Sequence, residues 1–358
     1  MKKQIKIRGA GPAGLTAAIT LARADYDVTV YEKSKGCGTR FKGDLQGLEN
    51  WTSQTNVVDE LKAASLDINF DCDPFCTLTG FDPDQQTSFI QSQEPLFYLV
   101  KRGPGPGTLD QGLAEQALQL GVDIRFNTPV SEEAVDIVAS GPNSRKLYAI
   151  DTGIIFETDF PDTAYGMLDD TSAHLGYSYL LVTKGYGCMC TVLFDKFSEI
   201  HQQFALVRRT FEDMTGINIK NPSSVGGYAS FSTKGPLVKE GSFYVGEAAG
   251  LQDLLWGFGI RFAVQSGHLA ARCLIEGRDY ATAARRMFQP DLRTGVVNRA
   301  IWEHLGNRGY KVFLAASRRS TEPRQFLNQW VFKDNWWRRL SFPLAMWDLR
   351  RRHPDIGY

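Results

Sequence analysis

A glycine-rich turn near the N-terminus is the first part of this sequence whose residue types and spacing can do chemistry. Residues 4–7 alternate polar and apolar side chains and predict a strand, and the turn 9–14, Gly-Ala-Gly-Pro-Ala-Gly, follows it. In such a turn the first glycine permits a tight bend, the second lets the backbone approach a pyrophosphate, and the third lets a helix pack on the strand. The pyrophosphate then meets the N–H groups at the start of that helix. We therefore expect a dinucleotide to contact Gly9, Gly11, Pro12, Ala13 and Gly14.

The sequence also predicts the helix and the strand that must position this turn. Residues 15–22 have the small and aliphatic pattern of a helix packed on a sheet, and residues 27–31 predict a second strand that ends at Glu32. An acid at this point accepts hydrogen bonds from ribose hydroxyls and disfavours a 2′-phosphate. The unit therefore favours FAD or NAD over NADP, with Glu32 and the adjacent Lys33 as cofactor contacts.

A second segment with cofactor chemistry lies far downstream. Residues 241–250, Gly-Ser-Phe-Tyr-Val-Gly-Glu-Ala-Ala-Gly, predict a strand that runs into a small-residue turn carrying the acid Glu247. Residues 256–260, Trp-Gly-Phe-Gly-Ile, come next, followed by a helix over about 261–276. Together with the N-terminal turn, these segments resemble the flavoproteins built like para-hydroxybenzoate hydroxylase, and among them the geranylgeranyl reductases.

This resemblance implies a tightly but non-covalently bound FAD. In that family the acid of the downstream turn lies by the FAD ribitol and pyrophosphate, and this chain has Glu247 where the family usually has Asp. The following glycine loop and helix start face the flavin pyrimidine ring, where N–H groups stabilise the charge of the reduced flavin. Arg40 has two interpretations: a contact with FAD, or a loop residue whose charge faces water. The FAD contacts that the resemblance implies are Arg40, Arg102, Val130, Gly246, Glu247, Gly257, Phe258, Gly259 and Ile260.

The pattern of elements predicts an α/β fold. We expect a Rossmann-like FAD-binding domain with a βαβ unit of the glutathione-reductase type, an inserted mixed or antiparallel β-sheet that binds substrate, and a C-terminal helical segment. The expected boundaries are 1–50, 99–145 and 238–315 for a discontinuous FAD-binding domain, 51–98 and 146–237 for the substrate-binding sheet, and 316–358 for the helical cap.

The substrate region contains a family motif in altered form. Residues 176–182, Gly-Tyr-Ser-Tyr-Leu-Leu-Val, align with the Tyr-x-Trp-x-Phe-Pro motif that lines the prenyl cavity of geranylgeranyl reductases. Tyr177 matches the first aromatic residue, Tyr179 replaces the tryptophan, and Leu181 stands in the place of the phenylalanine. The segment therefore predicts either an apolar pocket wall formed by these three side chains or a strand of a core sheet.

Few other side chains are candidates for chemistry. Cys37 lies in the segment that, in the resembling reductases, passes close to the isoalloxazine, so its thiol would either donate a proton or simply pack. His174 precedes the Tyr177 strand and either faces the pocket or is a hydrogen-bonded structural residue. The six cysteines have neither zinc-site spacing nor a disulfide framework. We therefore expect no metal and a reducing, cytoplasmic setting.

Charge balance and missing motifs narrow the function further. The 40 basic and 40 acidic residues give no indication of a nucleic-acid partner. No second dinucleotide fingerprint is found, so the electron donor is expected to be transiently bound NAD(P)H or a small redox protein. Residues 136–141 end without the Asp-Gly pair that the hydroxylases use, which counts against a hydroxylase. Three hypotheses remain: a reductase of carbon–carbon double bonds in an isoprenoid or other apolar, lipid-like substrate, a flavin monooxygenase of the aromatic-hydroxylase type, and a non-catalytic flavin redox sensor or binding protein.

The tail, residues 325–352, mixes tryptophans with arginines, and Pro343 is expected to interrupt any single helix there. Indole rings at headgroup depth and guanidinium groups on lipid phosphates would suit a peripheral contact with a membrane surface. Alternatively, the tail forms a helix pair that caps the substrate cavity and directs its arginines to water.

Overall fold

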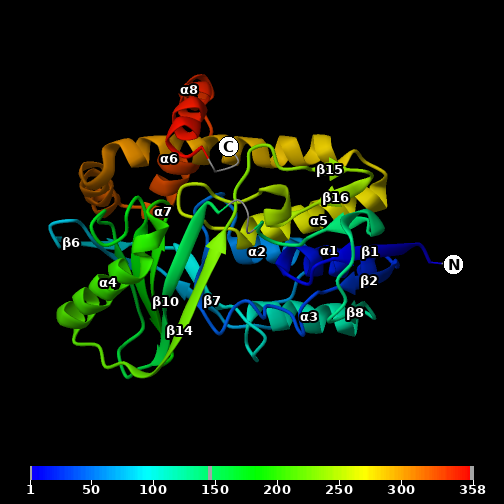
Figure 1. The fold of residues 1–358 in the computed structure, drawn as a ribbon, viewed down its shortest axis with the longest axis horizontal. Coiled ribbons are helices and arrows are strands. Elements are labelled where there is room, and N and C mark those ends of the chain that lie inside the picture. The colour runs from blue at the N-terminus through cyan, green and yellow to red at the C-terminus, as the bar shows by residue number, and fades with distance from the viewer. Residues whose placement is uncertain (1, 144–146, 355–358) are drawn as a thin grey trace.

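A mostly parallel sheet organises the N-terminal unit in the computed structural model, which describes residues 2–143 and 147–354 (Figure 1). Its strands are, in spatial order, β15 (Val238–Lys239), β16 (Ser242–Tyr244), β9 (Ile137–Val138), β1 (Gln4–Arg8), β2 (Asp27–Tyr31) and β8 (Asp123–Arg125). Neighbouring strands run parallel from β16 to β8, and β15 is antiparallel to β16. Strands from three distant parts of the chain thus meet in one sheet.

Helices rich in small residues pack on this sheet. α1 (Pro12–Arg23) lies between α3 (Leu109–Gln119) and α5 (Ile260–Glu276), as Figure 1 shows. Ile5 and Ile7 of β1, Val30 of β2 and Ile19 of α1 are buried in the common core. The predicted helix over about 261–276 is confirmed as α5. The α/β fold predicted from the sequence, with its Rossmann-like unit, mixed sheet and C-terminal helices, is confirmed as well.

A second, seven-stranded sheet is mixed. Its strands are, in spatial order, β14 (Lys220–Ala229), β10 (Ala149–Glu157), β13 (Tyr186–Leu193), β12 (Tyr177–Thr183), β11 (Thr163–Met167), β5 (Thr77–Phe81) and β6 (Thr87–Gln91). All neighbours are antiparallel except β11 and β5. Phe156 and Met189 of one face pack against Val207 and Phe211 of α4 (Ile200–Thr215). α4 does not cover the opposite face of the sheet, and residues of that face line a cavity.

Smaller elements connect the two sheets. A three-stranded antiparallel sheet consists of β3 (Leu45–Glu49), β7 (Phe97–Lys101) and β4 (Cys72–Phe75), and α2 (Val57–Ala63) lies between β3 and β4 in the sequence. The short helical turns are η1 (Glu132–Ala134), η2 (Phe197–Glu199) and η3 (Gly246–Ala249).

The C-terminal part is helical. α6 (Tyr280–Arg319) is kinked at Gly306, where φ is 49° and ψ is −139°. α6 continues past residue 315, where we expected the FAD-binding domain to end. The expected boundary at 145–146 and the last residues of the expected cap, 355–358, lie outside the described residues. The remaining elements are α7 (Pro323–Phe326), the π-helix η4 (Leu327–Phe332) and α8 (Trp336–Arg352), which projects beyond α6 in Figure 1.

The expectation that Pro343 interrupts the tail helix is wrong. α8 continues through Pro343, which lies on the exposed side of the helix. Proline removes the N–H that would bond to the carbonyl of Arg339, one turn earlier. On an exposed side, water can bind that carbonyl, so the helix does not have to end.

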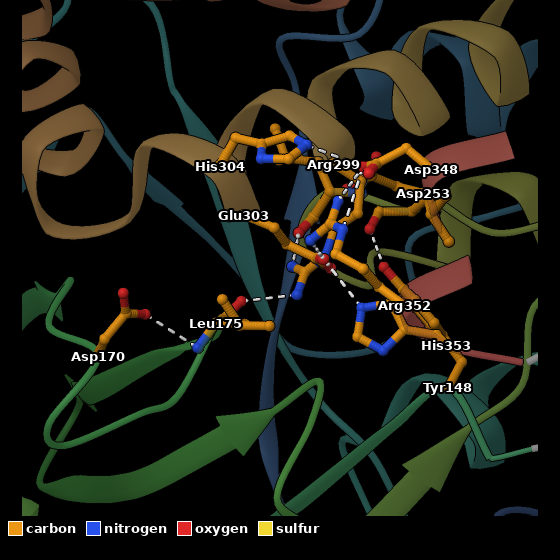
Figure 2. Close-up of polar contacts among 12 residues, drawn as sticks. Tyr148, Asp170, Leu175, Asp253, Arg299, Glu303, His304, Asp348, Arg352 and His353 are labelled. Carbon is orange, nitrogen blue, oxygen red and sulfur yellow. Dashed lines mark hydrogen bonds and ion pairs between the residues drawn. The ribbon is translucent and has the colours of Figure 1, made fainter. Parts of the chain in front are cut away.

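The inner side of α8 is anchored to α6 by a network of charges around Glu303 (Figure 2). The Glu303 carboxylate accepts hydrogen bonds from Arg299 at 2.6 Å and from Arg352, and it lies 2.8 Å from Nε2 of His353. Burial acts to raise the pKa of Glu303, but the surrounding positive charges, chiefly Arg299, lower it to about 2. A second carboxylate of the network, that of Asp348, lies 2.9 Å from Nε2 of His304.

A Glu303→Gln variant is expected to lose roughly 3 kcal/mol of unfolding free energy at neutral pH, because it removes the negative charge that neutralises buried arginine. A carboxylate with a lowered folded pKa stabilises the fold above its unfolded value of about 4.5, and this contribution is lost as the pH falls towards 2. Urea unfolding between pH 7 and pH 3 measures both effects.

The matched control is Glu212→Gln, which removes a half-exposed i,i+4 pair with Arg208 and should cost less than about 0.5 kcal/mol. Equal losses in the two variants at neutral pH would contradict the anchoring role of Glu303.

Candidate functional site

A cavity of about 590 Å³ extends from the glycine turn, past the inner face of the mixed sheet, to the C-terminal helices. Its walls are formed by the glycine turn, the end of β2, parts of the segments 36–47 and 245–260, strands β10 and β12, and parts of α6 and η4. One continuous space therefore joins the predicted dinucleotide site to the predicted substrate region.

The glycine turn has the geometry expected of a pyrophosphate cradle. Gly9 has φ of +101°, and a Cβ there would lie 2.3 Å from the carbonyl oxygen of Ala139. A Cβ at Gly14 would lie 2.0 Å from the carbonyl oxygen of Gly9, so Gly14 serves the packing of α1 and is not part of the cavity wall. A Cβ at Gly11, by contrast, would have no heavy atom of the described residues within 4 Å. The space beside Gly11 is therefore open for a ligand.

Glu32 is held in place at the end of β2. Its carboxylate accepts hydrogen bonds from the backbone N–H of Ala10 at 2.9 Å and of Ser34 at 2.8 Å. Glu32, Lys33 and Val130 all line the cavity beside the glycine turn. The carboxylate keeps accepting capacity for ribose hydroxyls, because each of its oxygens can accept more than one hydrogen bond.

The middle of the cavity carries charged side chains. Arg40 donates to the carbonyl of Tyr228 at 2.9 Å, and its guanidinium lies 3.7 Å from the Glu247 carboxylate. Burial raises the pKa of Glu247, and the charge of Arg40 opposes this shift. Arg40 is therefore part of a defined contact between residues 36–47 and the turn at η3, and both side chains line the cavity.

Arg102, which the resemblance assigns to FAD, is already engaged by protein groups. Its guanidinium makes two hydrogen bonds to Asp110, at 2.8 and 2.9 Å, and donates to Gln46 at 3.0 Å. It also lies 4.3 Å from the ring centroid of Phe41. Arg102 lines the cavity and is buried in this bidentate pair, so its guanidinium holds the cavity wall in place.

The start of α5 points towards the cavity. Gly259 precedes the helix, and among the described residues no side chain caps this terminus. The loop before it is fixed by Gln252, which donates to the carbonyl of Gly257 at 2.7 Å, and by Asp253, which accepts from the N–H of Trp256 at 2.8 Å. An uncapped helix start presents N–H groups and the positive end of the helix dipole, which favours negative charge nearby. Residues 257–260 all line the cavity.

Strand β12 contributes one face to the cavity wall. Tyr177, Tyr179 and Leu181 alternate along the strand and all line the cavity, while Leu180 packs towards α4. The Tyr177 hydroxyl donates to the carbonyl of Trp256 at 2.6 Å, which ties the sheet to the loop before α5. The two interpretations of this segment are thus compatible, because a strand of a central sheet forms the pocket wall.

Cys37 and His174 lie elsewhere: neither is among the described residues that line the cavity. Cys37 is buried, and burial, with smaller contributions from Asp110 and Glu32, raises the pKa of its thiol to about 12. The backbone N–H of His174 donates to Gln203 of α4, at 2.9 Å. The buried position of Cys37 is consistent with a thiol that simply packs, and the position of His174 is consistent with a structural role.

Sequence reasoning missed three acids in the cavity wall: Asp110, which pairs with Arg102, and Asp44 and Asp151. Asp151 of β10 pairs with Val192, which pairs with Tyr177, so these residues form one row on the inner face of the sheet. Burial and the neighbouring Asp44 raise the pKa of Asp151 to about 6, against the charge of Arg40. An acid at an inward position of an alternating strand was the available sequence signal.

The far end of the cavity is apolar and aromatic. The Trp51 ring packs edge-on against Phe97, Trp256 and Phe258, with centroid distances of 6.4, 5.8 and 5.3 Å. Further apolar residues of the same core cluster that line the cavity are Leu78, Ile90, Leu96, Leu99, Leu168, Leu181, Phe313, Leu314 and Leu327. This end can hold an apolar molecule and exclude water.

Neither a metal site nor a disulfide is found among the residues that the structure describes. Within residues 2–143 and 147–354, no group of three or more His, Cys, Asp or Glu side chains is placed to hold a metal ion. All six cysteines are free, and the Cys188 and Cys190 sulfurs lie 3.7 Å apart.

Comparison with known proteins shows which proteins have a similar fold. Residues 7–45 match the family model of the NAD(P)-binding Rossmann-like domain. No curated protein matches the sequence. Among solved structures, a geranylgeranyl bacteriochlorophyll reductase-like protein from Thermoplasma acidophilum has a TM-score of 0.72 and 17% sequence identity, over 98% of this chain and 100% of that chain.

Two further solved structures have related folds. A flavin-dependent brominase has a TM-score of 0.64 and 15% identity, over 98% of this chain and 100% of that one. The tetrameric form of 2-methyl-3-hydroxypyridine-5-carboxylic acid oxygenase has a TM-score of 0.56 and 16% identity, over 91% of this chain and 96% of that one. The chain thus shares the fold of these reductase-like, flavin-dependent and oxygenase proteins, which is the fold that the resemblance implied.

Proposed function

We propose that this chain, which has the fold of the FAD-dependent oxidoreductases, binds FAD non-covalently and reduces carbon–carbon double bonds of an isoprenoid or another apolar, lipid-like substrate. The observation that carries the proposal is the continuous cavity that begins at the glycine turn and ends among aromatic side chains. The electron donor in this proposal is transiently bound NAD(P)H or a small redox protein.

The residues present fit FAD. The open space beside Gly11 and the start of α1 suit the pyrophosphate, and the Glu32 carboxylate suits the ribose. The uncapped start of α5 suits the pyrimidine end of a flavin, where negative charge develops on reduction. The remaining residues that would hold the cofactor are Gly9, Pro12, Ala13, Lys33, Arg40, Arg102, Val130, Gly246, Glu247, Gly257, Phe258 and Ile260.

When bound, the flavin supplies the hydride from its N5 atom, and the protein positions the substrate and excludes water. Trp51, Phe97 and Trp256 hold the apolar part of the substrate. Reduction of a double bond also needs a proton on the second carbon. We assign this proton to Asp151, which lines the cavity in the same sheet row as Tyr177 and whose raised pKa keeps a protonated fraction near neutrality.

The proposal is tested by anaerobic incubation of the FAD-loaded protein with a prenylated lipid and a chemical reductant. We expect the mass of the lipid to rise by a pair of hydrogens for each reduced bond. Mass analysis of lipids that co-purify with the protein identifies which apolar molecule the cavity retains. Absence of any reduced product with saturating reductant and several prenyl chain lengths would refute the reductase proposal.

A monooxygenase is the second candidate, because the fold is also similar to that of a pyridine carboxylic acid oxygenase. The missing Asp-Gly pair after residue 139 counts against it. The same incubation in air separates the two candidates: incorporation of labelled oxygen into the product favours the monooxygenase, and a reduced product without oxygen favours the reductase.

A further inference from the structure

The outer side of α8 has an unusual composition for a helix face in water. Trp336, Leu340, Leu344 and Trp347 have exposed fractions of 73%, 74%, 66% and 57%. Their spacing places them on one side of the helix. The inner side is held by the contacts of Arg352 and Asp348 described above, so this exposed stripe is presented on an anchored helix that projects from the molecule (Figure 1).

The charges on α8 are distributed unevenly. Arg350 and Arg351 are exposed with the apolar stripe, and the guanidinium of Arg351 lies 5.2 Å from the ring centroid of Trp347. Arg339 is also exposed, but it is paired with Asp334 at 2.9 Å. The one acid of the helix, Asp348, is on the buried side. A solvated helix face usually mixes both signs of charge with polar residues. Here the outer face consists of tryptophan, leucine, proline and arginine.

Exposed apolar residues also lie beside the apolar end of the cavity. Trp330 of η4 is 71% exposed, and Leu327 of the same short helix lines the cavity. On α6, Val312 is 70% exposed, and the next residues, Phe313 and Leu314, line the cavity. The segments that close the cavity therefore carry exposed apolar side chains on their outer sides.

We propose that the outer face of α8, together with Trp330, docks on the surface of an anionic phospholipid bilayer, and that the apolar end of the cavity receives its substrate from this bilayer. Indole rings suit headgroup depth, leucine side chains suit the acyl boundary, and arginines pair with lipid phosphates. The contact is peripheral: no helix in residues 2–143 and 147–354 is long and apolar enough to cross a bilayer. The second part of the proposal rests on the proposed function.

A second copy of the chain is a less suitable occupant of this face. A twofold dimer places the same patch on both partners, so the arginines of one copy would approach those of the other. An anionic surface neutralises these charges, whereas the dimer brings like charges together.

The test is flotation of the FAD-loaded full chain with vesicles of phosphatidylcholine, with and without phosphatidylglycerol. We expect binding to the anionic vesicles that weakens with added salt. The triple variant Trp336→Ser, Leu340→Ser, Trp347→Ser should bind at least about tenfold more weakly. The variant Arg350→Gln, Arg351→Gln should lose about fivefold per arginine and most of its salt dependence.

The matched control is Leu206→Ser, Met214→Ser, which changes exposed apolar residues of α4 at 44% and 36% exposure. It should bind as the wild type does. Equal binding of the triple variant and this control would overturn the proposal. So would a lipid-free dimer that the triple variant converts to monomer in analytical ultracentrifugation. Vesicle binding is measured without turnover. The docking proposal can therefore be supported or overturned even if the protein does not reduce double bonds.

Discussion

A Gly11→Val variant is expected to fold normally and to lose its FAD. The backbone at Gly11 has φ of −87° and ψ of 179°, a conformation that any residue adopts, and a side chain there meets open space within the protein. In the proposed site, the pyrophosphate approaches the turn through this same space. Valine methyl groups would collide with the cofactor at a cost of up to about 3 kcal/mol, so binding should weaken by roughly 100-fold.

The measurement is the flavin absorbance of the purified variant, followed by titration of the FAD-free protein with FAD. Circular dichroism and urea unfolding without FAD check that the fold is retained. Gly105→Val is the matched control, because a Cβ at Gly105 also meets open space and this residue is outside the cavity wall. Wild-type flavin content in Gly11→Val would contradict the assignment of the glycine turn to FAD.

An Asp151→Asn variant is expected to reduce double bonds about 10²- to 10⁴-fold more slowly, which is the usual loss when a general acid is removed. Asparagine keeps the size of the side chain but cannot release a proton. Because the raised pKa of Asp151 is about 6, the wild-type rate should be highest below this pH and fall as the pH rises through it. The variant should lack this fall.

Reduction of the flavin by its electron donor should be unchanged in Asp151→Asn, because only the step on the substrate needs the proton. Stopped-flow measurement of each half-reaction separates the two, and Asp151→Glu should restore part of the rate. The matched control is Asp195→Asn, at an exposed acid just after β13. A rate within about threefold of wild type in Asp151→Asn would rule out this residue as the proton donor.

The parts of the site that were predictable from sequence depend on local spacing. The turn at Gly9 and the start of α5 are each encoded within about a dozen consecutive residues, and each reflects a backbone requirement that few sequences meet. The strand at Tyr177 was also predictable from its alternation, although which of its faces would be covered by α4 was not.

The remaining features depend on tertiary contacts. Asp151 became a candidate only when the register of β10, β13 and β12 placed it beside Tyr177. Arg102 pairs with Asp110, and a side chain on Gly38 would clash with that carboxylate at 2.6 Å, so three separate segments decide the position of the arginine. The continuation of α8 through Pro343 depends on which side of the helix faces outward. Single-sequence patterns carry none of this information.

The order of strands in the N-terminal sheet has a consequence for how the protein folds. β9 lies between β1 and β16, so Ile137 pairs with Ile7 on one side and with Phe243 on the other. These pairings join residues more than 100 positions apart, and such distant contacts form slowly because long loops must close first. During synthesis, the N-terminal motif therefore emerges long before its neighbouring strands are available. We therefore expect the segment at residues 7–45 to be one part of a unit that forms late, and the proposed cofactor site to be complete only after β16 and α5 have been synthesised.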